Sequence, residues 1–314
     1  MSLHKNLVRF YYKLRLPKNR WHIISVLPNL KLKNCAALNH DVKEIYYKGK
    51  FIAKTSPLTE LKQRKQKNCF IVATGPSIQT LDLTQLQNKF LIGVNGATAL
   101  ITSHQLKFSL YIVMDPSFVK HRFELVKAAI HAGTPCLFSY KVIDAICKQD
   151  SSLLQHAKLY LIQEINKRYD GITLPTSAFY DKIKNNPQLI TPISKTSNNP
   201  IGFSRNIEHG VFDGGTVTFW AAQVVYYIDF TNIFILGMDL HSKTGALRFY
   251  EKPSNQLPSY LEDDYESLIK PSFEALSHLM INEPIRFYNV SLQSRLSETI
   301  LPKISFETAL ELCQ

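Results

Sequence analysis

The chain has 314 residues, 45% of them hydrophobic, and a formal net charge of +12. This length allows one large domain or two small ones with an ordinary globular core, and no run of about 18 apolar residues predicts a transmembrane helix. Five scattered cysteines without a CxxC or Cys/His cluster, and no apolar segment of secretory type, exclude a disulfide framework and a zinc site and predict a cytoplasmic protein.

The basic excess lies in the N-terminal fifth of the chain. Residues 1–67 hold 16 Lys and Arg against three acids, whereas residues 68–314 hold 21 against 22. The stretch "HKNLVRFYYKLRLPKNRWHII" mixes cations with large apolar side chains, which is typical of a segment on an anionic membrane surface. A solvated basic arm or a nucleic-acid contact fits the same composition. We predict a basic N-terminal extension over 1–67, peripheral to the inner face of the cell membrane, and one main domain over 68–314.

Strand-like and helix-like segments alternate in the main domain. Apolar runs predict strands at 69–74, 90–95, 108–115, 134–140, 157–163, 232–239 and 285–291. Helices are predicted at 117–133, 215–230 and 265–283, and polar excursions at 170–208 and 240–265. This order predicts an α/β fold with a Rossmann-like, mostly parallel sheet and helices on both faces. We expect a single-domain variant of the GT-A type.

Small and polar residues follow five of the predicted strands. Ligands of such sheets bind outside the carboxyl ends of the strands. The residues at these ends are Thr74-Gly75-Pro76-Ser77, Asn95-Gly96, Asp115-Pro116-Ser117, Ser139-Tyr140 and Gly237-Met238-Asp239. Five such ends favour a ligand site, and ordinary polar turns are the alternative.

Two glycine-containing turns could face a ligand anion. Gly75-Pro76-Ser77 lacks the glycine spacing of a P-loop or a dinucleotide fingerprint. The usual sequence signatures of ATP-binding and NAD-binding sites are therefore absent from this turn. Asp213-Gly214-Gly215-Thr216 precedes a strongly apolar helix and predicts a cradle of backbone N–H groups, or else a capping threonine packed under two glycines. The chain has no Asp-x-Asp motif, which predicts no metal site and no cofactor.

An acidic stretch follows the second excursion. Its carboxylates are Glu262, Asp263, Asp264 and Glu266, and it either supplies a general base for a sugar hydroxyl or is a solvated loop.

Two blocks of the sequence resemble a known family. "FIVATGPSIQTLD", "GVNG" and "YIVMDPSFV" are similar to the N-terminal half of bacterial sialyltransferases that use CMP-sialic acid. "GGTVTFWAAQVVYYIDFTNIFILGMDL" resembles the same family's small-residue turn, buried helix and strand end, and looks equally like bacterial proteins resembling 6-hydroxymethylpterin diphosphokinase.

The resemblance implies a nucleotide-sugar site. Its implied contacts are Thr74, Gly75, Ser77, Asn95, Asp115, Gly215 and Thr216, and the predicted site adds Gly214, Asp239 and Tyr250. Asp115 stands where the family has Asn. The family's catalytic His has no counterpart in "EDDYESLIK", which leaves Glu266, Asp264 and His241 as candidates for the base.

The resemblance implies a glycosyltransferase that moves a 2-keto acid sugar, of sialic acid or Kdo type, from a CMP donor. The acceptor would be a saccharide or glycolipid of surface glycan or lipooligosaccharide biosynthesis, and a homo-oligomer is compatible with this function. The alternatives are an ATP-dependent pterin-type diphosphokinase and a basic nucleic-acid-binding module. Because residues 68–314 are nearly neutral, we expect no nucleic-acid partner.

Overall fold

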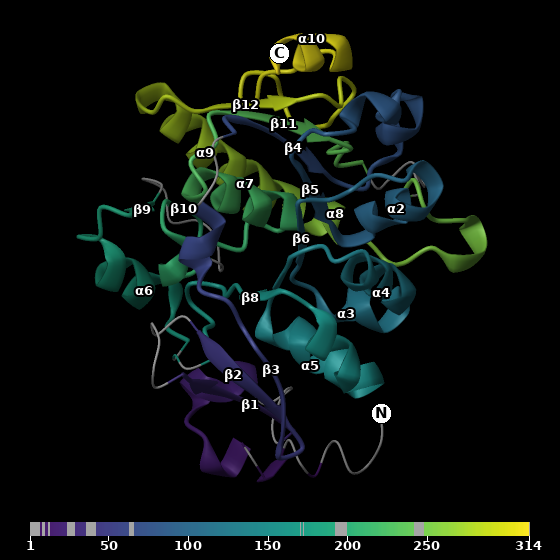
Figure 1. The fold of residues 1–314 in the computed structure, drawn as a ribbon. Helices are drawn as coiled ribbons and strands as arrows, with labels where there is room; N and C mark the ends of the chain where they lie inside the picture. Colours follow the sequence, from purple (N-terminus) through teal and green to yellow (C-terminus); the bar gives the residue numbers. More distant parts are fainter. Residues whose placement is uncertain are drawn as a thin grey trace.

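A seven-stranded parallel sheet forms the centre of the protein (Figure 1). The structure is a computed structural model. It describes residues 7, 10–11, 13–23, 29–35, 42–62, 66–169, 171, 173–191, 200–241 and 248–313.

All seven predicted strands are confirmed. They are β4 (Asn68–Val72), β5 (Leu91–Val94), β6 (Leu110–Val113), β7 (Cys136–Phe138), β8 (Leu159–Leu161), β11 (Asn232–Leu236) and β12 (Arg286–Asn289). Their order is β12-β11-β4-β5-β6-β7-β8, and every neighbouring pair is parallel. The predicted α/β class with a parallel sheet is therefore confirmed.

Both faces of this sheet are buried. In β4, Cys69 and Ile71 belong to the same core cluster as helix α7, whereas Phe70 and Val72 belong to a cluster on the opposite face. A strand buried on both sides needs apolar residues at consecutive positions, because neighbouring side chains point to opposite faces. This requirement explains why the strands are continuous apolar runs in the sequence.

Helices cover the two faces as separate layers (Figure 1). One layer contains α7 (Val217–Tyr227) and α9 (Lys270–Asn282). The other contains α2 (Ala99–His104), α3 (Pro116–His121), α4 (Phe123–His131), α5 (Tyr140–Asp150) and α10 (Phe306–Glu311). The helix predicted at 117–133 is broken at Arg122, whose backbone leaves the helical region. The helix predicted at 265–283 begins as a π-helical segment, η9 (Tyr265–Ile269), and Pro271 lies in the first turn of α9.

The two polar excursions contain short elements. The first holds α6 (Thr176–Ile183), β9 (Leu189–Ile190) and β10 (Phe203–Ser204), and the second ends with α8 (Leu261–Asp264). Residues 192–199 and 242–247 of these excursions lie outside the described residues. The 3-10 helices are η1 (Lys18–Ile23), η2 (Leu58–Lys62), η3 (Pro76–Thr80), η4 (Leu83–Leu86), η5 (Asn95–Thr98), η6 (Ser151–His156), η7 (Ile207–His209) and η8 (Pro253–Asn255).

A small antiparallel sheet lies within the predicted N-terminal extension. It consists of β1 (Leu30–Asn34), β2 (Lys43–Tyr47) and β3 (Lys50–Lys54), and Lys48-Gly49 form a two-residue hairpin turn in which both residues have positive φ. Its apolar side joins the core beside α5, and the Ser56 N–H donates to the Leu159 carbonyl at 2.6 Å. No strand is predicted here, because the excess of lysines in residues 1–67 is interpreted as a basic arm. The alternation in Leu30-Lys31-Leu32-Lys33 is nevertheless the period of two of a strand with one exposed face.

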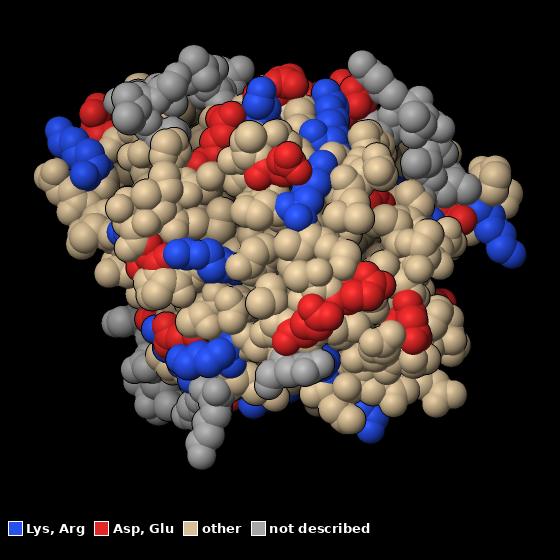
Figure 2. Space-filling view, turned by 90° about the horizontal axis from the view of Figure 1, so that it is seen from above, with Lys and Arg blue, Asp and Glu red and all other residues tan. Residues whose placement is uncertain are grey.

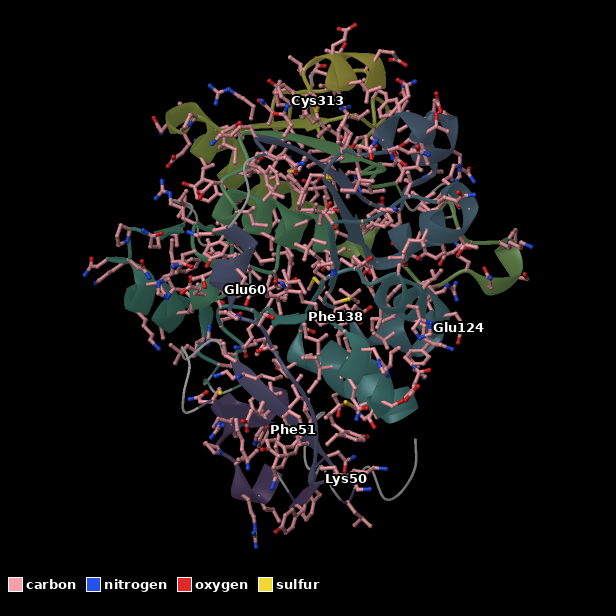
Figure 3. All side chains as sticks on the ribbon, in the orientation of Figure 1. Lys50, Phe51, Glu60, Glu124, Phe138 and Cys313 are labelled. Atoms are coloured by element: carbon pink, nitrogen blue, oxygen red, sulfur yellow. The ribbon has the colours of Figure 1, made fainter. Side chains whose placement is uncertain are left out.

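The small sheet and helix α10 occupy opposite ends of the molecule. Lys50 and Phe51 lie at the far end of the small sheet, and Cys313 lies at the other end beside α10 (Figure 3). Basic and acidic side chains are interspersed on the face seen from above, which carries α10 and β12 (Figure 2). Among the described residues, no helix combines the length and the apolar character that crossing a bilayer requires.

Candidate functional site

The strand order reverses between β4 and β11, and this switch point brings two predicted turns together. The chain runs from β4 outward to β8 and then returns to β11 on the other side of β4. The Gly75 N–H donates to the Gly237 carbonyl at 2.8 Å, and the Ser77 N–H donates to Asp239 Oδ2 at 3.0 Å. Because ligands of open α/β sheets bind in the crevice at such a switch point, this edge is the candidate site.

Gly75 is required by the close approach of these two turns. A Cβ atom at Gly75 would lie 2.1 Å from Asp239 Oδ2 and 2.6 Å from the Gly237 carbonyl oxygen. The Ser77 hydroxyl oxygen is also 2.9 Å from that of Ser291, which follows β12. The Asp239 carboxylate thus accepts the hydrogen bond of the Ser77 N–H. This contact fixes the turn that is predicted to contact the nucleotide.

Asn95 and Tyr250 form a second part of the site. The edge of the Tyr250 ring packs on Gly96 so closely that a Cβ there would be 1.9 Å from Tyr250 Cε1. The Phe249 N–H donates to the Thr74 carbonyl at 3.1 Å. Asn95 Oδ1 is buried and has no hydrogen-bond partner among the residues that the structure describes, which is rare for a polar atom. Burial raises the pKa of Tyr250 to about 12, so its phenol is protonated at neutral pH.

A buried ion pair holds the Tyr250 segment across the strand ends. The Glu251 side chain is only 1% exposed and accepts from Arg122 at 3.2 Å and from Arg248 at 3.0 Å. Arg122 lies at the junction of α3 and α4, so this contact ties the second excursion to the helical layer. Nearby, Asp115 is exposed and caps α3 by accepting from the Ser117 N–H at 2.8 Å.

The Asp213–Thr216 turn leads into α7. Gly214 and Gly215 have φ values of 63° and 68°, and a Cβ at either would lie within 3 Å of Phe219 or Ile269 side-chain atoms. Thr216 Oγ1 accepts from the Thr218 N–H at 3.4 Å as the N-cap of α7. The capping interpretation of Thr216 is therefore confirmed, while the anion cradle stays a prediction.

Charged side chains surround Asp213. Glu164 pairs with Lys167 at 2.9 Å and with Lys141 at 3.5 Å. Burial, followed by the charge of Glu164, raises the pKa of Asp213 to about 6, although Lys167 opposes the shift. Burial also raises the pKa of Tyr140, whose hydroxyl has no hydrogen-bond partner among the described residues.

The three predicted base candidates lie in different surroundings. The Glu266 side chain is 67% exposed and pairs with Lys270 at 3.3 Å. His241 is exposed, and its Nε2 is 2.7 Å from the Gln293 carbonyl oxygen. Asp264 contributes to the raised pKa of Asp213 and so belongs to that cluster. In the described part of the chain, no group of three or more His, Cys, Asp or Glu side chains is arranged to hold a metal ion.

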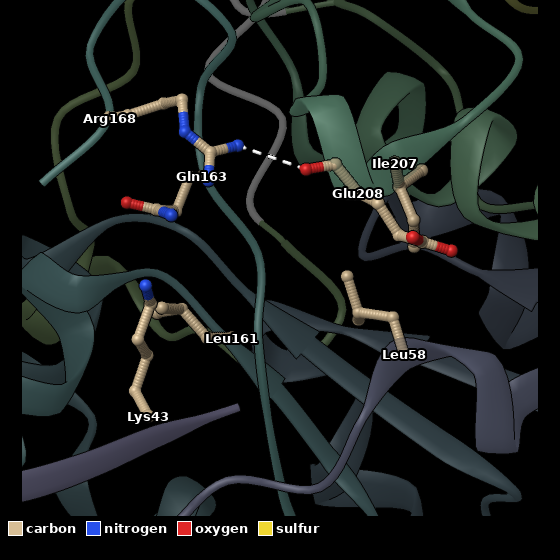
Figure 4. A pocket seen from close by; sticks show the side chains of 7 residues that line it. All are labelled: Lys43, Leu58, Leu161, Gln163, Arg168, Ile207 and Glu208. Carbon is tan, nitrogen blue, oxygen red and sulfur yellow. Dashed lines mark hydrogen bonds between the residues drawn. The ribbon is translucent and has the colours of Figure 1, made fainter. Parts of the chain in front are cut away.

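A small pocket lies away from these residues (Figure 4). It lies between β2, the end of β8 and η7, and Arg168 Nη1 donates to the Glu208 carbonyl at 3.0 Å across it. Its lining residues are Lys43, Leu58, Leu161, Gln163, Arg168, Ile207 and Glu208. No predicted site residue lines this pocket, so it does not define the site.

Several charged residues of this edge were not predicted from the sequence. Lys141 lies shortly after the end of β7 and Glu164 shortly after the end of β8, so the rule that ligands bind at carboxyl ends could have found them. Arg122 and Glu251 carry no such signal, because their pairing joins distant parts of the chain.

Comparison with known proteins identifies the family. A family model described as 3-deoxy-D-manno-octulosonic acid transferase WaaZ matches residues 51–307. The chain belongs to this family. The match covers all seven strands of the central sheet and most of β3. The protein is therefore a glycosyltransferase of the WaaZ family, and the comparisons do not favour the diphosphokinase alternative.

Two curated relatives agree with the WaaZ assignment. A probable 3-deoxy-manno-octulosonic acid transferase of Escherichia coli strain K12 is 25% identical over 267 residues, which is 82% of this chain and 89% of the relative. A protein of the same description from Salmonella typhimurium strain LT2 is 25% identical over 81% of this chain and 93% of its own. The comparisons thus support the Kdo type among the two predicted 2-keto acid sugars, and the sialyltransferase family is only loosely related.

One solved structure is similar in part. The MAf glycosyltransferase of Magnetospirillum magneticum AMB-1 matches 78% of this chain with a TM-score of 0.44 and 12% sequence identity. The chain spans 34% of that protein.

Proposed function

We propose that the protein transfers 3-deoxy-D-manno-octulosonic acid (Kdo) from CMP-Kdo to a saccharide of a lipid-linked oligosaccharide. The observation that carries this proposal is the WaaZ family match over 51–307, which includes the whole central sheet. Sialic acid and Kdo are both 2-keto acid sugars, so the predicted CMP donor chemistry applies equally to the sugar named in the family description.

The switch point supports a nucleotide site for this donor. Asn95 offers a buried oxygen that has no hydrogen-bond partner in the described part of the chain, and the neutral Tyr250 phenol can donate a hydrogen bond. We propose that Tyr250 and the turns at Gly75 and Gly215 contact the nucleotide and its leaving phosphate. A positioned donor to the developing charge contributes on the order of 2–4 kcal/mol to the transition state, by analogy with an oxyanion-hole donor.

We also propose that the N-terminal segment lies on an anionic membrane surface that displays the acceptor. Leu7, Phe10 and Leu14 are helical and 61%, 63% and 72% exposed. Residues three and four apart share one side of a helix, so at this spacing these side chains would form an apolar stripe. Lys13 and Arg15 provide charge for anionic headgroups.

Thermal stability with a nucleotide panel tests the donor. A ligand at about 100 times its Kd stabilises the folded state by about 2.7 kcal/mol. We expect CMP and CDP to raise Tm, and ATP with Mg²⁺ to leave it unchanged. Stabilisation by ATP with Mg²⁺ but not by cytidine nucleotides would contradict the proposal.

Vesicle flotation tests the membrane contact. Replacing Leu7, Phe10 and Leu14 with Ser should release the protein from vesicles containing anionic lipid and leave CMP binding intact. Leu292→Ser is the matched control, because Leu292 is 52% exposed after β12, outside the N-terminal segment. Equal flotation of the triple variant and the control would overturn the membrane proposal.

A further inference from the structure

The small antiparallel sheet has one buried face and one exposed face. Leu30, Ile45 and Ile52 are buried in the same core cluster as helix α5. The side chains of the opposite face, here called the outer face, form two rows that each cross all three strands. The rows are Lys31–Tyr46–Phe51 and Lys33–Glu44–Lys54. In both rows the residues of β1 and β3 are exposed.

A β-bulge in β3 adds Phe51 to this face. Residues three apart in a regular strand, such as Phe51 and Lys54, point to opposite faces. Here the pairing of β2 with β3 shifts between Ile45 and Tyr46, which leaves Ile52 without an opposite residue. Because of this extra residue, the Phe51 and Lys54 side chains both lie on the outer face.

Two aromatic rings and a lysine pack together on the outer face. The ring centres of Tyr46 and Phe51 are 5.7 Å apart at an interplanar angle of 73°, and Lys33 Nζ lies 4.3 Å from the centre of the Tyr46 ring. The Tyr46 hydroxyl donates to Glu44 Oε2 at 2.9 Å, while Phe51 is 53% exposed. Aromatic rings beside lysines are typical of the boundary between lipid headgroups and acyl chains.

The described residues of the sheet are strongly basic. From β1 to the end of β3 they include Glu44 as their single acid, and five lysines are exposed. These lysines are Lys31, Lys33, Lys48, Lys50 and Lys54. Each lysine close to an anionic bilayer strengthens binding by about fivefold, so such a set is sufficient for docking.

The sheet and the N-terminal segment lie at the same end of the molecule (Figure 1). Leu16 of that segment packs against the core cluster that contains Leu30, and Trp21 Nε1 donates to the Leu16 carbonyl at 3.0 Å. We propose that the outer face docks on an anionic lipid bilayer, with its lysines at the lipid phosphates and the Phe51 ring among the headgroups. The inference uses other residues than the N-terminal stripe and does not depend on Kdo transfer.

Protection of the sheet edges is the other explanation for these lysines. β1 and β3 are both edge strands, and lysines on an edge hinder pairing with another chain. This role accounts for Lys31, Lys33 and Lys54. It does not account for the exposed Phe51, which adds apolar surface to the same edge.

Vesicle co-sedimentation tests the lysines. The vesicles contain phosphatidylglycerol and phosphatidylcholine in equal parts. Combining Lys31→Gln, Lys33→Gln and Lys54→Gln should lower the partition coefficient by about 100-fold, at about fivefold per lysine. The control removes the same charge from exposed positions outside the sheet, by Lys107→Gln, Lys182→Gln and Lys184→Gln, and should bind nearly as well as wild type. Equal binding of the two variants would overturn the proposal.

Fluorescence quenching tests the position of residue 51. Vesicles with brominated lipids should quench the emission of Phe51→Trp beyond the quenching of the native Trp21 and Trp220 in wild type. Ile281→Trp is the matched control, because Ile281 is 73% exposed on α9, and it should add no quenching. A sheet whose lysines only protect its edges predicts no added quenching in Phe51→Trp either, and that result would refute the docking.

A labelled DNA duplex in the same buffer tests the other kind of polyanion. Loss of DNA binding without loss of vesicle binding in the sheet-lysine variant would assign the outer face to nucleic acid and overturn the proposal. The two membrane contacts also fail separately. Unchanged flotation of the variant with Leu7, Phe10 and Leu14 replaced refutes the N-terminal stripe, whereas an unchanged partition coefficient of the sheet-lysine variant refutes the outer face.

Discussion

The Asp239 carboxylate accepts a hydrogen bond from the Ser77 backbone N–H at 3.0 Å and so joins the turns after β11 and β4. Asp239 is buried, and 162 positions separate the two residues in the chain. This contact spans the point at which the strand order reverses, where we place the donor.

Asp239→Ala should destabilise the protein by about 1–3 kcal/mol, because it leaves the Ser77 N–H without its acceptor. Asp239→Asn keeps an acceptor oxygen and should lose less. Urea denaturation measures both free energies. Asp181→Ala, at an exposed position of α6, is the control and should stay within about 0.5 kcal/mol of wild type. Equal stabilities of Asp239→Ala and wild type would show that the contact does not hold the two turns together.

Gly96→Ala should displace the Tyr250 ring, because a Cβ would lie 1.9 Å from Cε1. We expect a loss of about 1–3 kcal/mol, the usual cost of overpacking, and weaker CMP binding. In a Tyr250→Ala background the same change should cost little, because the ring is gone. A double-mutant cycle measures this coupling. Additive effects would show that Gly96 and Tyr250 do not restrain each other.

Glu251→Ala should remove about 3–5 kcal/mol of stability, since it leaves Arg122 and Arg248 without their buried partner. It should also weaken CMP binding through Tyr250. The exposed pair of Lys127 and Glu124 is the matched control, and Lys127→Ala should cost less than about 1 kcal/mol. A Glu251→Ala variant as stable as Lys127→Ala would mean that the second excursion is not anchored here.

Because of Asp213, the free energy of unfolding should fall as pH rises between about 4 and 6. Its pKa is raised from 3.8 to about 6, so in this window the folded state binds more protons than the unfolded state. Above that window the ionised carboxylate costs about 1–3 kcal/mol. Asp213→Asn removes the cost and should be more stable than wild type at pH 8. Urea denaturation at pH 4 and pH 8 checks the sign; a less stable variant at pH 8 contradicts it.

The central sheet was predictable because each of its strands is buried on both faces. In β4, for example, the four buried residues 69–72 are all apolar, and such a continuous apolar run is easily recognised in the sequence. The small sheet has one exposed face, so Lys31 and Lys33 interrupt Leu30 and Leu32 and resemble a charged arm. Helix α5 was missed because its polar residues leave only short apolar stretches.

The site was predictable as a set of strand ends but not as a set of contacts. Parallel strands bring their carboxyl ends to one edge, which places Gly75, Asn95 and Asp239 in one region. The contacts of Ser77 with Asp239 and of Gly96 with Tyr250 depend on loops distant in sequence, and no local pattern encodes them. The choice between sialic acid and Kdo could not be made from the sequence, because the turns that carry the resemblance are predicted to contact the nucleotide.

The most direct test of the account is transfer from CMP-Kdo by the purified full-length protein. CMP-Kdo, CMP-sialic acid and ATP with Mg²⁺ are offered in parallel with a lipid-linked core oligosaccharide, and mass spectrometry follows the acceptor. We expect the acceptor to gain the mass of one Kdo residue from CMP-Kdo alone, with stoichiometric release of CMP. Addition of sialic acid, or phosphate transfer from ATP without any gain of Kdo, would contradict the account.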